Sequence, residues 1–195
     1  MRRLVYYIAV SLDGFIADVH GGTDAFPNHP ETLNALFDMY PETCPVHFRD
    51  VLGITAPSKR FDAVIMGAET HRPAVEAGMT SAYPHLDQYV VTHHAIPSDS
   101  TVKVINDDVA DHVQQMKAHP GKDIWLCGGA DLAGQLIDHI DEIQLKVNPI
   151  TLGSGIPLFR RTSNRAWSLA TKQELPGGVM LLTYQASSAG SADRP

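Results

Sequence analysis

The feature that most constrains the fold of this chain is a series of short apolar runs, rich in β-branched residues, that alternate with helical stretches. The runs lie at residues 5–10, 63–66, 89–92, 102–105, 124–127 and 143–147. Their length and composition are typical of strands. Three of them, at 63–66, 89–92 and 124–127, are continuously hydrophobic, which is typical of strands covered on both faces in a parallel sheet. We therefore expect an α/β domain with helices on the faces of its sheet.

The stretches between the runs predict the covering helices. Asp107 and Asp108 precede an apolar stripe at helical spacing over residues 109–116, so negative charge lies at the N-terminus of that helix, where it is stabilising. Residues 130–140 repeat the apolar stripe. With the neighbouring strands, these helices make two βα units between residues 89 and 143.

The C-terminal part predicts a different arrangement. Residues 166–172 and 179–184 are strand-like, and Pro176, Gly177 and Gly178 between them favour a tight turn. We expect an antiparallel hairpin here. The predicted fold is a single three-layer α/β domain whose central sheet is mostly parallel and has an antiparallel C-terminal edge.

The chain has 195 residues, a length that suits one domain, which we place at residues 1–185. Residues 186–195 lack large apolar side chains and are expected to form a disordered tail. Residues 21–60 are interrupted by five prolines and offer only a short helix, at 32–40. We expect this segment to be an excursion over the mouth of an active site.

Charge and cysteine content exclude several classes of protein. The formal net charge of −7 gives no electrostatic footprint for a nucleic acid or an anionic membrane, so neither partner is expected. Cys44 and Cys127 stand far apart and form no Cys-x-x-Cys pair, which favours a reduced, cytoplasmic protein. The apolar N-terminal run is interrupted at Ser11, too early for a signal-peptide core or a membrane span.

Open α/β sheets bind ligands at the carboxyl ends of their strands, so the residues that follow each run are the candidate site. Three such ends carry residues suited to a nucleotide, and each also fits an ordinary turn or a solvated loop. Glycine allows close approach of a ligand, and a helix N-terminus favours phosphate. The candidates are Gly67 and Thr70 after the second run, Thr92, His93 and His94 after the third, and Gly128, Gly129 and Ala130 after the fifth.

Two other chemistries lack their motifs. The ten histidines include no His-Glu-x-x-His and no Cys/His cluster, so no metal site is expected. Ser154 lies between two glycines, but it lacks the spacing of a Gly-x-Ser-x-Gly elbow and precedes Pro157 instead of a helix, which disfavours a serine hydrolase.

Four motifs, in their order along the chain, carry a family resemblance. They are IAVSLDGFIA at 8–17, VIMGAET at 64–70, LCGGA at 126–130, and NPI at 148–150 with GSGIPLF at 153–159. Together they resemble the dihydrofolate-reductase-like superfamily, and most of all the reductase domain of the bacterial bifunctional deaminase-reductases of riboflavin biosynthesis. The likeness extends over residues 4–185.

The resemblance implies a reductase that binds NADPH across the carboxyl ends of the sheet and forms a homodimer. It implies that Asp13 faces the substrate cleft, as a proton relay or an orienting group, while the alternative is that Asp13 only caps its own Asp-Gly turn. The implied cofactor contacts are Ala9 at the nicotinamide, Gly67 and Thr70 at the diphosphate, Gly128, Gly129 and Ala130 at the diphosphate and nicotinamide, and Thr92, His93 and His94 at the adenosine.

Departures from the family pattern concern the substrate more than the fold. The riboflavin-pathway domains usually carry an acidic residue before the glycine pair, where this chain has Cys127. Dihydrofolate reductases often have a basic residue where Ala68 stands. Asp24 and Asp38 are the candidates for a cleft carboxylate, and neither aligns with the one in dihydrofolate reductases, which disfavours dihydrofolate reduction.

The leading hypothesis is an NADPH-dependent transfer of hydride to a C=N or C=O carbon of a small heterocycle, similar to 5-amino-6-(5-phosphoribosylamino)uracil reduction. A phosphoribosyl group would need a basic partner, and the sequence leaves Arg49, Arg60, Arg72, Arg160 and Arg161 open. The alternatives are a nucleotide-binding regulator with little or no turnover, a pterin- or folate-type reductase, and a flavin-binding α/β domain.

Overall fold

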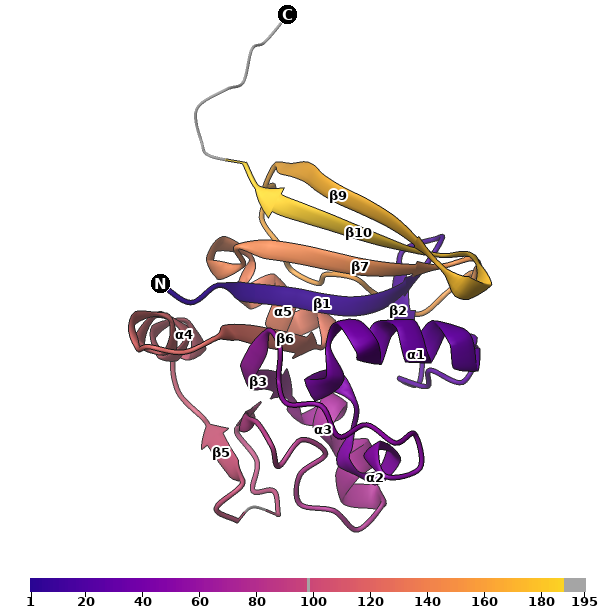
Figure 1. Ribbon diagram of the computed structural model, residues 1–195. Helices are drawn as coiled ribbons and strands as arrows, with labels where there is room; N and C mark the ends of the chain where they lie inside the picture. Colours follow the sequence, from indigo (N-terminus) through magenta and orange to yellow (C-terminus); the bar gives the residue numbers. More distant parts are fainter. Residues whose placement is uncertain (98, 188–195) are drawn as a thin grey trace, which may run out of the picture.

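The computed structural model describes residues 1–97 and 99–187 of the chain. An eight-stranded sheet has the order β5-β4-β3-β6-β1-β7-β10-β9. Figure 1 shows these strands stacked from β9 at the top to β5 at the bottom. The strands of this sheet are β1 (Leu4–Ser11), β3 (Phe61–Gly67), β4 (Asp87–Val91), β5 (Val102–Ile105), β6 (Asp123–Gly128), β7 (Glu142–Asn148), β9 (Trp167–Leu175) and β10 (Val179–Ala186).

Each apolar run of the sequence forms a strand, and the predicted pairing directions are confirmed. The strands from β5 to β7 are parallel, whereas β10 pairs antiparallel with β7 and with β9. The hairpin between β9 and β10 turns through the 3₁₀ segment Pro176–Gly178, in which Gly177 and Gly178 have φ of 77° and 73°. Such positive φ values favour glycine, which is why the sequence predicts this turn.

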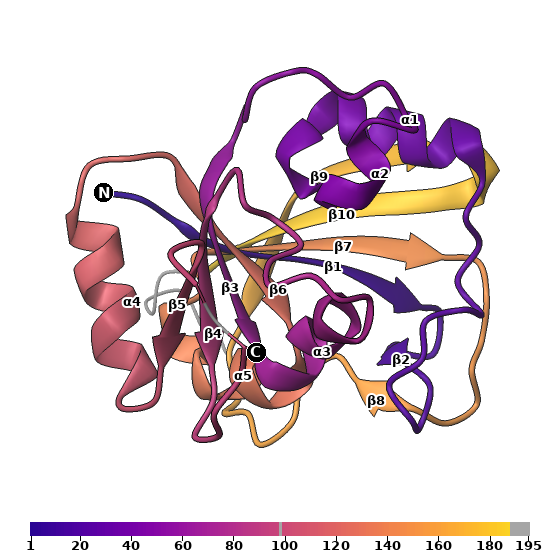
Figure 2. The same cartoon turned by 90° about the horizontal axis from the view of Figure 1, so that it is seen from below.

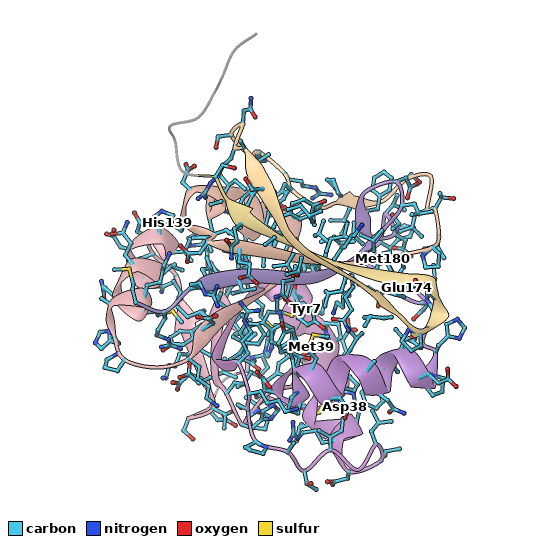
Figure 3. The ribbon with its side chains drawn as sticks, turned by 45° about the horizontal axis from the view of Figure 1, so that its top comes forward. Tyr7, Asp38, Met39, His139, Glu174 and Met180 are labelled. Carbon is cyan, nitrogen blue, oxygen red and sulfur yellow. The ribbon has the colours of Figure 1, made fainter. Side chains whose placement is uncertain are left out.

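Helices cover both faces of the sheet and make the molecule three-layered. Helices α4 (Val109–Ala118) and α5 (Ala130–Gln135) pack on one face, around a core that includes Tyr6, Ile65 and Leu126. On the other face α1 (Pro30–Met39) covers a second core around Tyr7 and Trp125. Figure 3 shows Tyr7 and Met39 between β1 and α1. The remaining short helices are η1 (Pro41–Thr43), α2 (Val46–Arg49), α3 (Ala68–Glu76) and η2 (Ile137–His139).

Of two predicted helices, one agrees with the structure and the other is too long. The acidic start of α4 is confirmed, because the Asp108 carboxylate accepts hydrogen bonds from the amides of Ala110 and Asp111. The single helix predicted over 130–140 is wrong in its second half: α5 ends at Gln135 and the 3₁₀ segment η2 follows. A Cβ at Gly134 would lie 1.7 Å from the Arg160 carbonyl oxygen, so the loop around Arg160 crosses directly over this short helix.

A small second sheet was not predicted. Strand β2 (Phe15–Ala17) pairs antiparallel with β8 (Ile156–Pro157). Gly155 is required at this crossing, since a Cβ there would lie 2.2 Å from the Ala17 carbonyl oxygen. This sheet ties the loop after β1 to the loop after β7.

The C-terminal end of the described part lies in β10 and in the residue that follows it. Strand β10 runs to Ala186, and the Ser187 amide donates to the Ala166 carbonyl. The rest of the predicted tail, residues 188–195, lies outside the described residues. Among the helices of the described part, none is long and apolar enough to cross a membrane.

Candidate functional site

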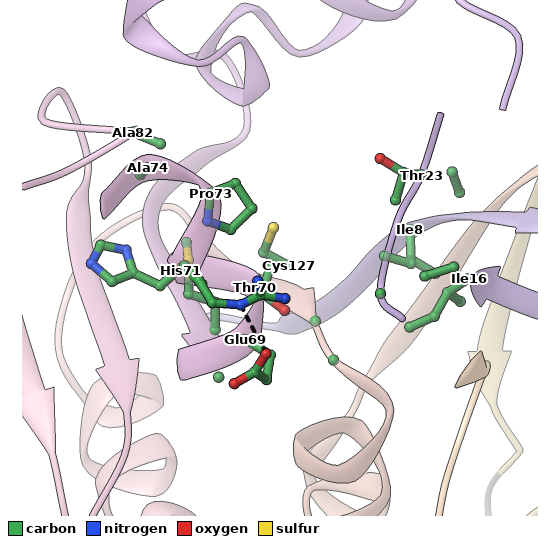
Figure 4. A pocket seen from close by; sticks show the side chains of 18 of the residues that line it. Ile8, Ile16, Thr23, Glu69, Thr70, His71, Pro73, Ala74, Ala82 and Cys127 are labelled. Carbon is green, nitrogen blue, oxygen red and sulfur yellow. Dashed lines mark hydrogen bonds and ion pairs between the residues drawn. The ribbon is translucent and has the colours of Figure 1, made fainter. Parts of the chain in front are cut away.

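A cleft of about 1030 Å³ opens beside the carboxyl ends of the central strands. Its walls come from the ends of β1, β3 and β6, from the start of α3, and from the long segment between β2 and β3. Thr23, Phe26 and His47 of that segment line the cleft, so the predicted excursion over residues 21–60 does border it. Figure 4 looks into this pocket, with Thr70 and Cys127 near its centre and Thr23 across from them.

Two helix N-termini meet in the cleft. Gly67 is the N-cap of α3 and Gly129 is the N-cap of α5, and neither helix has a side-chain cap. A Cβ at Gly67 would lie 4.0 Å from the Gly129 amide nitrogen, which shows how closely the two starts approach. In Figure 2 the two helices lie beside each other at one end of the strands. Their first amides, which have no partner within a helix, therefore point toward a common volume.

The residues predicted after β3 and β6 are brought together around Thr70. The Thr70 hydroxyl oxygen would lie 3.4 Å from a Cβ at Gly128 and 3.6 Å from a Cβ at Gly129. Gly128 has φ of 143°, a conformation that side chains rarely permit, and its peptide bond to Gly129 is cis. Ala130 and Ala9 also line the cleft. The predicted cofactor residues that share this one cleft are Ala9, Gly67, Thr70, Gly128, Gly129 and Ala130.

The predicted adenosine corner lies past the cleft wall. Val91 lines the cleft, whereas Thr92, His93 and His94 do not. Thr92 is buried, and its hydroxyl oxygen accepts a hydrogen bond from the His94 amide at 3.1 Å. His93 and His94 are exposed at the same edge of the sheet. This corner is in position to extend the cleft, and its contact with a nucleotide stays a prediction.

Asp13 is engaged differently from the predicted catalytic role. Its carboxylate accepts hydrogen bonds from the Ser11 hydroxyl at 2.6 Å and from the amides of Leu152 and Gly153 at 3.1 and 2.7 Å. The hydrogen bond from Ser11, followed by those from the two amides, lowers the pKa of Asp13. Asp13 does not line the cleft. The geometry favours the alternative, in which Asp13 holds its own turn, and the carboxylate also ties this turn to a second loop. A catalytic role of Asp13 stays a prediction.

Three side chains from neighbouring strands form the floor of the cleft, and sequence reasoning missed two of them. They are Cys127 on β6, Tyr7 on β1 and Lys146 on β7. The Lys146 ammonium nitrogen lies 4.0 Å from the centre of the Tyr7 ring. Burial raises the pKa of the Cys127 thiol to about 12 and lowers the pKa of Lys146 to about 8, while each partly offsets the other's shift.

A sequence signal for Lys146 did exist. Within β7, polar side chains at Glu142, Gln144 and Lys146 alternate with apolar ones, so one face of a central strand is polar. Glu142 and Gln144 are buried. Arg60 donates a hydrogen bond to the Glu142 carboxylate, and the Gln144 side chain donates one to the Tyr40 hydroxyl. The apolar run over residues 143–147 predicts the strand but not this polar face. The period-two pattern places Lys146 on the same face as Glu142 and Gln144.

Of the five arginines left open for a substrate phosphate, two line the cleft. Arg72 pairs with Glu69 and Glu76, and Arg160 pairs with Asp131. The other three are outside the cleft wall: Arg49 donates to the carbonyls of residues 41 and 56, Arg60 pairs with residues 123 and 142, and Arg161 is exposed. Of the two candidate acids, Asp24 lines the cleft and Asp38 does not. Within residues 1–97 and 99–187, no group of three His, Cys, Asp or Glu side chains could hold a metal ion.

The profile of the RibD C-terminal domain matches residues 2–181, nearly the whole chain. This chain belongs to the RibD C-terminal domain family. A similar protein in Bacillus subtilis (strain 168), the uncharacterized protein YwjB, is 32% identical over 182 residues, which are 90% of each chain.

Solved structures of related proteins agree with the architecture. A putative riboflavin biosynthesis protein from Shewanella sp. PV-4 has a TM-score of 0.68 at 22% identity, with 96% of this chain and 100% of that one covered. The diaminohydroxyphosphoribosylaminopyrimidine deaminase/5-amino-6-(5-phosphoribosylamino)uracil reductase of Thermotoga maritima has a TM-score of 0.65 at 13% identity, over 95% of this chain and 57% of that one.

The fold is dihydrofolate-reductase-like, as the motifs indicated. The Enterococcus faecalis dihydrofolate reductase, solved in complex with NADP(H), has a TM-score of 0.63 at 14% identity and covers 95% of this chain and 97% of its own. The relatives of this RibD C-terminal domain in family and fold therefore include reductases.

Proposed function

We propose that this RibD C-terminal domain is an NADPH-dependent reductase that transfers hydride to a C=N or C=O carbon of a small heterocyclic substrate. The observation that carries the proposal is the meeting of two helix N-termini without side-chain caps at Gly67 and Gly129, inside a cleft at the carboxyl ends of the strands. Such a pair of N-termini offers amide donors and positive dipole ends to a diphosphate.

The residues on the wall fit a dinucleotide. Gly67, Gly128 and Gly129 carry no Cβ, so backbone can approach a diphosphate closely, and Thr70 stands between them with its hydroxyl. Ala9 and Ala130 leave room at the ends of β1 and β6 for a flat ring. We assign the diphosphate to the two helix starts, the nicotinamide to the Ala9 side, and the adenosine to the corner at residues 92–94.

When bound, the reduced nicotinamide supplies hydride, and the chain's own residues position the substrate and exclude water. Phe26, Leu36 and Phe37 line the cleft from the long segment and from α1, and they give the substrate side an apolar wall. An apolar enclosure strengthens the few polar contacts within it. The polar contacts available in this cleft are those of its floor, which is made by Tyr7, Cys127 and Lys146.

The substrate class that we propose follows the printed activity of one structural neighbour. The Thermotoga maritima protein is a 5-amino-6-(5-phosphoribosylamino)uracil reductase, and a role in riboflavin biosynthesis is our first expectation for this chain. Arg72 and Arg160 are the lining cations suited to a substrate phosphate, because a guanidinium binds phosphate through two parallel hydrogen bonds. Since both cysteines are free thiols, we place the protein in the cytoplasm.

A second candidate is a nucleotide-binding regulator with little turnover. It is favoured by Cys127, which stands where the riboflavin-pathway pattern usually has an acid, and by Asp13, whose carboxylate is taken up by a loop. A pterin- or folate-type reductase is the third, and Asp24 on the cleft wall is the carboxylate it would use.

Thermal unfolding with added NADPH tests the cofactor site. A ligand that binds only the folded protein raises its free energy of unfolding, by about 2.7 kcal/mol when the ligand concentration is one hundred times its Kd. The melting temperature rises as a result. We expect this rise in the wild type and in Ala118→Val, a control at the exposed end of α4, and its loss in Gly129→Val. A Cβ at position 129 is compatible with the fold, since in Gly129→Ala it would lie 3.6 Å from the Thr70 hydroxyl oxygen, an ordinary contact distance. An undiminished rise in folded Gly129→Val protein would contradict the placement.

Turnover then separates the candidates. We expect loss of absorbance at 340 nm, the band of NADPH, when 5-amino-6-(5-phosphoribosylamino)uracil is added to the NADPH complex. Turnover of a dihydropterin alone would favour the third candidate. NADPH binding with no turnover of either compound would favour the regulator.

A further inference from the structure

Lys146 is the one lysine or arginine on the cleft wall that lacks a carboxylate partner within the described residues. The other two lining cations, Arg72 and Arg160, are held by acidic side chains. No hydrogen bond or ion pair of the Lys146 ammonium occurs within the part of the chain that the structure describes, and its nearest defined contact is the face of the Tyr7 ring. An ammonium group in this position costs stability unless a ligand compensates it.

The register of the sheet places this ammonium beside the expected hydride donor. Lys146 pairs directly with Ala9, the residue that we assign to the nicotinamide, and both belong to the face that α1 covers. Tyr7, two residues before Ala9 on β1, shares that face. A substrate between α1 and the nicotinamide would therefore rest on Lys146.

A second group at the same floor lacks a partner. The Tyr7 hydroxyl is buried, with the residue only 1% exposed, and it makes no hydrogen bond within the described residues. Tyr7 lines the cleft as well. Buried polar groups are normally satisfied in native proteins, so an unpartnered hydroxyl next to an unpartnered ammonium points to a polar ligand that completes both.

The neighbours of Lys146 do not neutralise it. Among the described residues, the Cys127 thiol on β6 and the Tyr7 phenol on β1 lie beside it on the floor, and burial raises the pKa of both, so both stay uncharged at neutral pH. Asp24 and His47 of the long segment line the same cleft, and neither is among the causes of the lowered pKa of Lys146. On β10 its register partner is the apolar Leu181. The floor thus presents a positive charge and no negative one, which suits an electron-rich oxygen or nitrogen.

We propose that the Lys146 ammonium binds the heteroatom of the substrate's reducible C=N or C=O bond and donates the proton which that atom takes up. The inference rests on the proposed reductase function. As hydride reaches the carbon, the π electron pair of the bond moves to the heteroatom. A bond from the heteroatom to hydrogen forms while an N–H bond of Lys146 breaks, and the resulting neutral amine regains a proton from water.

The expected pH dependence follows from burial. Burial lowers the pKa of Lys146 to about 8, so the side chain holds its proton at pH 7 and can release it to a developing anion. The rate of hydride transfer should fall as pH rises through this value. At pH values between the lowered pKa of Lys146 in the folded protein and the ordinary pKa of lysine, the unfolded chain binds more protons than the folded one. The stability cost of Lys146 is therefore present in full at pH 7 and disappears as the pH rises through this range.

Lys146→Met tests the proposal, with Lys103→Met on the exposed edge strand β5 as its control. We expect Lys146→Met to keep NADPH affinity, to melt at or above the wild-type temperature at pH 7, and to lower single-turnover oxidation of NADPH by about 10²-fold or more. Lys146→Arg should keep a positive charge beside the heteroatom but lose most of the rate, because a guanidinium does not release its proton near neutral pH. The control should match the wild type in all three measurements.

Two results would overturn the role of Lys146. One is a rate of NADPH oxidation in Lys146→Met within about threefold of wild type. The other is a melting temperature of Lys146→Met so far below wild type that unfolding explains the lost rate. A labelling experiment tests the same role even without turnover. With NADPH present, 5,6-diaminouracil should slow the reaction of Lys146 with trinitrobenzenesulfonate and leave the reaction of Lys103 unaffected. Equal labelling of Lys146 with and without 5,6-diaminouracil would remove it from the substrate site. Failure of the wild type to bind NADPH would instead contradict the proposed function.

Discussion

At the scale of single residues, Asp13 shows how a motif can give the position of a residue without giving the partners of its side chain. The family pattern places Asp13 after the first strand, and the structure does so too. Its carboxylate, however, accepts hydrogen bonds from Ser11 and from the amides of Leu152 and Gly153. Local hydrogen bonding of this kind is a known use of Asp in turns, but the second loop that it ties lies about 140 residues later, and no local pattern predicts such a contact.

We predict that Asp13→Ala lowers the melting temperature while NADPH affinity is retained and turnover falls less than about tenfold, below the 10²-fold scale of a lost general acid. Because the pKa of Asp13 is lowered in the folded protein, its stabilisation is present above the ordinary carboxyl pKa and is lost as pH falls through the folded value. The difference in melting temperature from wild type should therefore narrow in acid. A constant difference between pH 7 and pH 3 would contradict this assignment.

Lys146 illustrates the opposite case, a residue that the sequence displays and the motifs do not mark. Its alternation with Gln144 and Glu142 is present in the sequence, but the apolar positions of the same strand dominate the interpretation. Whether such a polar side chain meets a structural partner or an open cleft depends on the strands beside it. That information exists only after the sheet is assembled.

At the scale of elements, the strands were predictable because each is long enough to carry a hydrophobic pattern. The pair β2 and β8 was not, since strands of three and two residues show no periodicity. The prolines of the segment between β2 and β3 predict an excursion. They do not predict its path, which depends on contacts with other parts of the fold, one of them fully buried.

That contact is made by Glu42, which is 0% exposed. Its carboxylate accepts hydrogen bonds from the amides of Lys59, Arg60 and Phe61 at 3.1, 2.7 and 2.6 Å. The following residue, Thr43, lines the cleft. Glu42 therefore connects the cleft wall to the start of β3.

We predict that Glu42→Ala reduces the free energy of unfolding by about 2–4 kcal/mol, since three amides would lose their acceptor and that of Phe61 is buried. Urea unfolding monitored by tryptophan fluorescence measures the change. Asp138→Ala, at an exposed position after α5, should stay within about 0.5 kcal/mol of wild type. Equal stability of the two variants would show that the Glu42 contact contributes nothing.

At the scale of the whole molecule, the exposed outer edge of the sheet bears on assembly. Strand β9 pairs on one side only, with β10, and its residues 168–174 are all exposed, with Leu169 at 53%. Unpaired edge strands are prone to pair with another chain. We propose that two copies associate through β9 across a two-fold axis, as the family resemblance implied.

Light scattering should then give a mass twice the 21.2 kDa of the chain at micromolar concentration. Leu169→Arg, which would bring a positive charge from each copy into the proposed contact, should shift the mass toward a single chain without loss of folding. A wild-type mass of one chain would contradict the proposed dimer.

The central claim is the location of the cofactor, at the junction of two helix starts in a dihydrofolate-reductase-like sheet. Glycines mark this junction, and others lie far from it: Gly121 contacts Arg2 and Asp62, and Gly177 contacts His29. Because the chain has 15 glycines, selective ¹⁵N labelling gives a spectrum simple enough to follow each amide.

Titration of ¹⁵N-glycine protein with NADP⁺ is the most direct measurement. We expect the amide resonances of Gly67, Gly128 and Gly129 to shift together with one dissociation constant, while those of Gly121 and Gly177 stay in place. A titration that moves Gly121 or Gly177 and leaves the three junction glycines unchanged, or one that moves no glycine at saturating NADP⁺, would contradict the account.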